Sequence, residues 1–120
     1  MNAIPQETEA QAQARVCLWL DLRGILYCHV PNGGKRGLIT GRQLKRQGLK
    51  KGVQDILIFD PPPAFPDRVG TAVEMKRRDG GKGESGDQVQ WRIALVKRRW
   101  VSLVAYGADD AIRQLMRLGY

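Results

Sequence analysis

Two acidic residues and a lysine stand on predicted strands that are otherwise largely apolar. Residues 53–59 are rich in β-branched and large apolar side chains, which predicts a strand, and residues 69–76 predict a strand that returns beside it. Side chains alternate between the two faces of a strand, so Asp55 shares a face with apolar residues and Glu74 shares a face with Lys76. If the two strands pair, Asp55 and Glu74 meet at one point, with Lys76 one pleat away.

This combination of side chains suits the hydrolysis of phosphate esters. An ionised carboxylate among apolar neighbours is costly unless a cation or hydrogen-bond donors meet it. Two carboxylates on adjacent strands form an oxygen site for Mg²⁺, which takes few protein ligands and leaves other positions to water and phosphate. A nearby lysine helps to orient or deprotonate the attacking water and stabilises charge in the transition state. The alternative is that Glu74 and Lys76 form an ordinary ion pair at an exposed edge.

Two polar residues at the starts of predicted helices extend this candidate site. Glu9 continues the apolar stripe of a helix over residues 10–22, and Gln88 does the same for a helix over residues 86–98. Each also has a local explanation. An acidic residue is favoured near a helix N-terminus, and Gln88 forms a capping-box pattern with Ser85.

The charge of the chain favours a polyanionic partner. Its 120 residues include 20 Lys plus Arg against 12 Asp plus Glu, a net charge of +8 with an isoelectric point near 10.0. No acidic residue occurs between positions 22 and 54, which favours phosphate contacts there over a merely solvated face. The candidate nucleic-acid-binding residues are Asn32, Lys35, Arg36, Arg42, Lys45, Arg46, Lys50, Lys51 and, in a glycine-rich loop, Lys82.

Several classes of protein do not fit the sequence. No apolar stretch approaches the about 18 residues of a membrane span, and no signal-peptide pattern is visible. Two cysteines and the single histidine, His29, make neither a disulfide framework nor a closed zinc site. We therefore expect a cytoplasmic protein that is not secreted, from a bacterial or phage-infected cell.

The order of predicted elements indicates an α/β domain with a small mixed sheet flanked by helices, spanning residues 1–120. Strands are predicted at residues 25–30, 53–59, 69–76 and 100–106. Helices are predicted at residues 10–22, 39–47, 86–98 and 108–118.

These residues together resemble a VRR-NUC domain (virus-type replication-repair nuclease), a branch of the PD-(D/E)XK nuclease superfamily. The matching pieces lie in the family's order over nearly the whole chain: Thr8-Glu9 with Gln13, the run from His29 to Arg36, Leu44-Lys45 with Gly48, Gly52 to Asp55, Glu74 to Arg77, and Gln88 with Trp91.

The resemblance implies a restriction-endonuclease-like core and a nuclease that needs Mg²⁺ or Mn²⁺. It further implies that Asp55 and Glu74 bind the metal together with the Met75 carbonyl, and that Lys76 is the catalytic lysine. Glu9 would be an additional acid of the site, and Gln88 the motif glutamine. One position departs from the family pattern, because Gln54 replaces the proline before the aspartate. We expect tolerance of this change, since Gln54 and Asp55 point to opposite faces.

The resulting functional hypothesis is a metal-dependent endodeoxyribonuclease in DNA replication, repair or recombination. By analogy with junction resolvases it would act as a homodimer on branched or flapped DNA. The alternative is a basic nucleic-acid-binding module without catalysis. Binding alone does not explain Asp55 and Glu74, because carboxylates repel a phosphate unless a cation lies between them.

Overall fold

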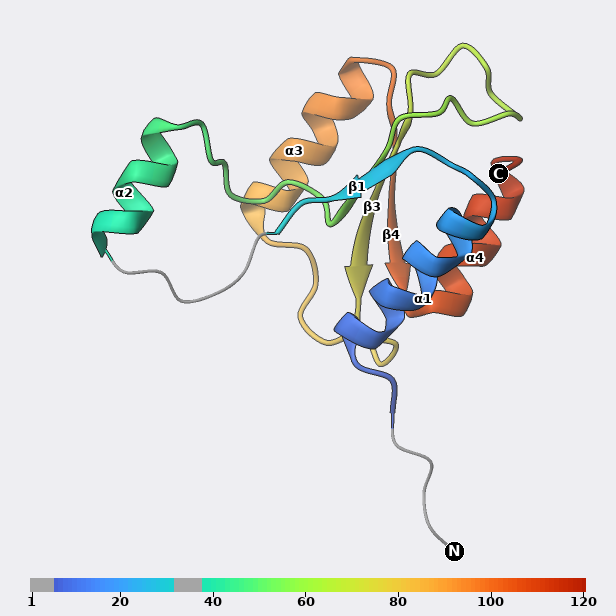
Figure 1. The fold of residues 1–120 in the computed structure, drawn as a ribbon, viewed down its shortest axis with the longest axis horizontal. Coiled ribbons are helices and arrows are strands. Elements are labelled where there is room, and N and C mark those ends of the chain that lie inside the picture. The colour runs from blue at the N-terminus through green and yellow to red at the C-terminus, as the bar shows by residue number, and fades with distance from the viewer. Residues whose placement is uncertain (1–5, 32–37) are drawn as a thin grey trace, which may run out of the picture.

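The computed structural model describes residues 6–31 and 38–120, and side chains within these ranges except those of residues 38–40 (Figure 1). Three of the candidate phosphate-binding residues, Asn32, Lys35 and Arg36, lie outside the described residues. The helices and strands follow the predicted order: α1 (Glu9–Leu22), β1 (Tyr27–His29), α2 (Leu38–Arg46), β2 (Ile56–Ile58), β3 (Thr71–Lys76), α3 (Gly86–Lys97), β4 (Val101–Tyr106) and α4 (Ala108–Arg117).

Helices α1 and α3 begin at capping boxes, as their sequences predict. The Thr8 hydroxyl accepts a hydrogen bond from the Gln11 backbone N–H at 3.0 Å, and the Gln11 side chain accepts one from the Thr8 N–H at 2.9 Å. Ser85 and Gln88 make the same pair of bonds at α3. Both boxes satisfy backbone N–H groups that have no partner inside the helix, and they set the first turn of each helix.

The described strands form a four-stranded mixed sheet in the order β1-β2-β3-β4. Strands β1, β2 and β3 pair antiparallel, while β4 runs parallel to β3 and is reached through α3. All six residues of β3 are buried, including Glu74 and Lys76. The strand that carries the candidate site is therefore covered on both faces.

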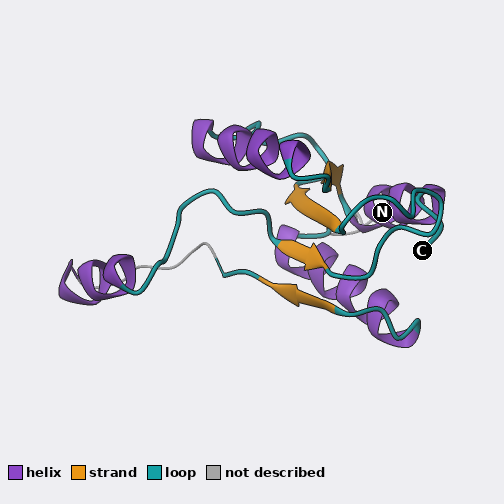
Figure 2. Ribbon diagram, turned by 90° about the horizontal axis from the view of Figure 1, so that it is seen from above, coloured by secondary structure: helices purple, strands orange, loops and turns teal. Residues whose placement is uncertain are grey.

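Helices α1 and α4 cover one face of the sheet, and α3 covers the other (Figure 2). The apolar core lies on the α1 and α4 side. Its buried members are Ala12, Val16, Leu20, Ile56, Ile58, Val73, Met75, Leu103, Ala105, Ala108, Ala111 and Leu115. The sequence prediction of an amphipathic stripe on α1 is confirmed, because Val16 and Leu20 are fully buried.

Strand β2 differs from its prediction in length and in its buried face. It spans three residues, and Ile56 and Ile58 are fully buried, whereas Phe59 on the alternate face is 44% exposed. Asp55 does share its face with apolar residues, as expected, but on that face Leu57 is half-buried and Phe59 exposed. The larger apolar layer comes from α1 and α4, and it selects the even-numbered residues of β2 for burial.

Helix α2 extends away from the sheet and the other three helices (Figures 1 and 2). It ends with basic Lys45 and Arg46, and the chain returns from it to the sheet along residues 47–55. No helix among the described residues is long and apolar enough to cross a membrane.

The core on α1 predicts a sharp difference between two leucines of the same helix. Leu20 is fully buried, whereas Leu18 is 58% exposed. We expect Leu20→Ala to lower the free energy of unfolding by about 2–5 kcal/mol, because the substitution leaves a cavity. Leu18→Ala should change it by about 0.5 kcal/mol or less. Urea unfolding followed by circular dichroism measures both values, and equal losses would contradict this assignment of the core.

Candidate active site

The pairing of β2 with β3 brings Asp55 and Glu74 together. Ile56 lies opposite Val73, so Asp55, the residue before β2, falls opposite Glu74 in the same register. The Asp55 Oδ2 atom accepts a hydrogen bond from the Met75 backbone N–H at 2.7 Å. The two carboxyl groups predicted from strand alternation to converge therefore do so in the structure.

Glu74 occupies an environment that disfavours its charged form. Its side chain is buried, with 3% of the residue exposed. Burial raises the pKa of Glu74 to about 8, and the negative charge of the neighbouring Asp55 acts in the same direction. Lys76 opposes this shift, and Glu9 adds to it weakly. Two carboxyl groups held this close are best accommodated by a shared proton or by a cation.

Lys76 lies beside Glu74 on the same strand face. Its Nζ atom is 3.8 Å from Glu74 Oε2 and donates a hydrogen bond to Gln88 Oε1 at 2.9 Å. Lys76 is 8% exposed, so this ion pair is not the exposed edge pair considered as an alternative. The lysine places a positive charge next to the two carboxyl groups.

Gln88 combines the two roles that the sequence left open. Its Oε1 atom accepts from the Ser85 backbone N–H at 2.8 Å, which completes the capping box of α3. The same side chain donates from Nε2 to Glu74 Oε2 at 3.1 Å and accepts from Lys76. The first turn of α3 is thus connected to the face of β3 that carries Glu74 and Lys76. We call Asp55, Glu74, Lys76 and Gln88 the carboxylate–lysine cluster.

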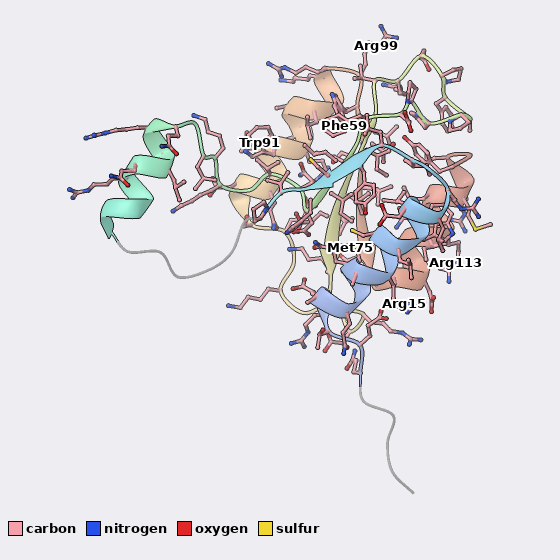
Figure 3. All side chains as sticks on the ribbon, viewed as in Figure 1. Arg15, Phe59, Met75, Trp91, Arg99 and Arg113 are labelled. Carbon is pink, nitrogen blue, oxygen red and sulfur yellow. The ribbon has the colours of Figure 1, made fainter. Side chains whose placement is uncertain are left out.

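Glu9 and Met75 stand at the border of this cluster. Glu9 is the exposed first residue of α1, and its charge contributes to the raised pKa of Glu74, so it lies within electrostatic reach. The Met75 side chain is buried in the core under α1 (Figure 3). Its backbone N–H donates a hydrogen bond to Asp55.

The chemistry of the cluster fits a small divalent cation. Among the described residues, no group of three His, Cys, Asp or Glu side chains is arranged to hold a metal ion. Mg²⁺, however, commonly takes only one or two carboxylates from a protein and completes its shell with water and substrate phosphate. Glu74 Oε1 is a buried acceptor without a hydrogen-bond partner in the described structure. A cation between Asp55 and Glu74 would satisfy this oxygen and remove the repulsion between the two carboxylates.

A further contact, not predicted from the sequence, involves the backbone carbonyl of Asp55. The His29 Nδ1 atom lies 2.8 Å from the Asp55 carbonyl oxygen and 2.8 Å from the Gln13 Nε2 atom. The Val30 backbone N–H donates to the same Asp55 carbonyl at 2.8 Å. The signal was present in the sequence, because Gln13 lies one turn after Glu9 on α1 and His29 lies near the end of the strand predicted at residues 25–30. Only the fold shows that His29 reaches the Asp55 carbonyl and that Gln13 contacts His29.

The remaining basic candidates lie on exposed segments outside the cluster. They are Arg42, Lys45, Arg46, Lys50 and Lys51 in and after α2, and Lys82 in the loop before α3. The described side chains of α2, those of residues 41–46, extend outward from the helix (Figure 3). The structure therefore leaves these cations accessible, as a role in phosphate binding requires.

Comparison with known proteins supports the fold that these elements form. No protein-family model matches the chain, and no curated protein matches it significantly. A solved structure described as "VRR_NUC domain protein" is similar, with 25% sequence identity and a TM-score of 0.72 over 96% of this chain and 93% of that chain. The predicted α/β fold with a small mixed sheet and the predicted resemblance to a VRR-NUC domain are both confirmed.

The raised pKa of Glu74 predicts an unusual pH dependence of stability without metal. In the unfolded chain the carboxyl ionises near pH 4.5, whereas in the folded protein it keeps its proton until about pH 8. Below pH 4.5 Glu74 is protonated in both states, so its ionisation does not affect the free energy of unfolding. Between pH 4.5 and 8 only the folded state keeps the proton, so the free energy of unfolding should fall by up to about 1.4 kcal/mol per pH unit as the pH rises.

Glu74→Gln removes this titration and keeps the shape of the side chain. Urea unfolding of both proteins in EDTA at pH 5, 6, 7 and 8 should show the variant gaining stability relative to the natural protein as the pH rises. Parallel curves for the two proteins would mean that Glu74 ionises normally in the folded state.

Proposed function

We propose that this protein is a divalent-metal-dependent endodeoxyribonuclease that hydrolyses phosphodiester bonds in DNA. The observation that carries the proposal is the carboxylate–lysine cluster. Gln88 is hydrogen-bonded to both Glu74 and Lys76, and Asp55, held by the Met75 N–H, stands opposite Glu74. The similarity to a VRR_NUC domain protein supports a nuclease-type fold around this cluster.

Asp55 and Glu74 would hold the metal, joined by the Met75 carbonyl and Glu9 as the resemblance implies. A bound Mg²⁺ or Mn²⁺ would supply Lewis-acid activation of the scissile phosphate and of the attacking water. Asp55 is oriented for this role from both sides, because its carboxylate accepts from Met75 and its carbonyl accepts from Val30. Such fixed orientation of ligand groups is what a metal site requires of its protein.

Lys76 would act on the reacting phosphate directly. Gln88 holds its Nζ atom at 2.9 Å, which restricts a long and otherwise mobile side chain. From this position the ammonium group would donate a hydrogen bond to a phosphate oxygen or orient the attacking water, and it would stabilise negative charge as it develops. Gln88 contributes by keeping Lys76 and Glu74 at a fixed separation.

The exposed basic residues of α2 and of the loop before α3 would bind the phosphates that flank the cleavage site. Contacts to phosphates carry no sequence information, so we propose that DNA shape rather than sequence determines the substrate. Branched or flapped DNA and a homodimeric enzyme are part of this proposal, on the analogy with junction resolvases. A substrate series of junction, flap, single strand and duplex, with light scattering of the protein, tests both points.

Substitutions within the cluster should abolish cleavage without unfolding the protein. We expect Glu74→Gln and Lys76→Ala each to lower the cleavage rate in Mg²⁺ by about 100-fold or more, because each removes a group that acts in the transition state. EDTA should suppress cleavage by the natural protein. Lys97→Ala, at the exposed end of α3, serves as the control and should cleave normally.

The same assay separates catalysis from binding. A gel-shift measurement of DNA affinity accompanies each cleavage reaction. If the natural protein binds DNA tightly but cuts no member of the substrate series in Mg²⁺ or Mn²⁺, the chain is a non-catalytic binding module and the proposed function is wrong.

The basic residues of α2 and the segment after it should affect affinity rather than chemistry. Lys45→Ala combined with Lys50→Ala removes two exposed cations outside the cluster. We expect weaker DNA binding. We also expect the negative slope of log affinity against log salt concentration to become less steep by about one to two, since each phosphate contact contributes about 0.9 to its magnitude. Arg117→Ala, at the exposed end of α4, should leave the slope unchanged. An unchanged slope in the double variant would show that α2 does not contact the phosphates.

A further inference from the structure

A second glutamine, Gln54, contacts α3 from the strand side. It directly precedes Asp55 and is 1% exposed. Its Nε2 atom donates a hydrogen bond to the backbone carbonyl of Gln88 at 3.2 Å. Gln54, which directly precedes Asp55, therefore contacts the helical turn that contains Gln88, and the Gln88 side chain binds Glu74.

The backbones on either side of this hydrogen bond are in direct contact. Gly52 has a φ of +88°, and a Cβ atom at this position would lie 2.5 Å from the carbonyl carbon of Asp87. Only glycine allows this approach and this backbone conformation at low cost. Residues 52–54 and the first turn of α3 thus pack backbone to backbone, with the Gln54 amide as a hydrogen-bonded contact between them.

Gln54 is an unfavourable choice for folding alone. Its Oε1 atom is buried and has no hydrogen-bond partner in the described structure. A buried acceptor without a partner costs free energy, and an apolar side chain of similar shape avoids this cost. The carbonyl of Gln88 belongs to a helix and does not depend on a side chain to be satisfied. The Gln54 amide is therefore better explained by what it positions than by what it stabilises.

We propose that Gln54 is a positioning residue for the carboxylate–lysine cluster. Its amide N–H fixes the backbone of Gln88, and Gln88 in turn holds Glu74 Oε2 at 3.1 Å and Lys76 Nζ at 2.9 Å. Gln54 touches neither the DNA nor the metal in this scheme. It acts through Gln88, and for its effect on turnover this inference rests on the proposed nuclease function.

Gln54→Met separates positioning from packing, because methionine keeps the length of the side chain and removes its hydrogen-bonding groups. We expect the midpoint of urea unfolding to be unchanged or higher than in the natural protein. The affinity for Mn²⁺, measured by calorimetry, and kcat for DNA cleavage should each fall about 10-fold or more, as for other residues that orient a metal site. KM for DNA should change little, since the exposed basic residues are untouched.

Gln90→Met is the matched control, since Gln90 is an exposed residue of the same helix. It should keep the Mn²⁺ affinity and kcat of the natural protein. If Gln54→Met also keeps both, or loses stability in proportion to activity, Gln54 is a packing residue and the inference is wrong.

An NMR measurement tests the contact independently of the proposed function. The side-chain amide signals of Gln88, assigned with Gln88→Glu, should shift and exchange faster with solvent in Gln54→Met but not in Gln90→Met. Such shifts would support the inference even if the natural protein neither binds Mn²⁺ nor cleaves DNA. The absence of Mn²⁺ binding and cleavage would overturn only the proposed function. Unchanged Gln88 signals in Gln54→Met would overturn the inference whatever the activity.

Discussion

The register between β2 and β3 is the constraint on which the candidate site depends. With Ile56 opposite Val73, Asp55 meets Glu74 and its carboxylate accepts the Met75 N–H. A slip of one residue would turn every side chain of β2 to the other face of the sheet. It would expose the buried isoleucines of β2 and move Asp55 away from Glu74. The apolar layer under α1 and α4 resists this slip, so the packing of the core also sets the geometry of the cluster.

Burial explains both the cost and the use of the cluster. Glu74 lies on a strand that is covered on both faces, where ionisation is unfavourable and electrostatic interactions are strong. A buried carboxyl pair of this kind is a poor way to stabilise a fold. Under the proposed function, a cation bound by the two carboxylates would offset this cost. The lysine on the same face limits the repulsion without cancelling it.

Helix α3 contributes to the site through its end rather than through its length. The turn that caps the helix also places Gln88 against Glu74 and Lys76, so one glutamine serves local structure and the site together. The basic residues, in contrast, are not part of the packed site. They lie on exposed segments outside the cluster, where a polyanion could reach them, while the carboxylate–lysine cluster lies in the body of the domain.

The sequence by itself determined the elements and most of the cluster. Strand alternation placed Glu74 and Lys76 on one face. The capping box located the start of α3 and therefore put Gln88 in its first turn. Both patterns can be read from the sequence because they depend on neighbours close in the chain. Tertiary structure alone decided which face of β2 is buried, since this depends on the layer that α1 and α4 supply from distant segments. It also decided the contacts of Gln54 with Gln88 and of His29 with Asp55, which join residues 34 and 26 positions apart. No local pattern encodes such pairs, because the distances that create them exist only once the sheet and helices have packed.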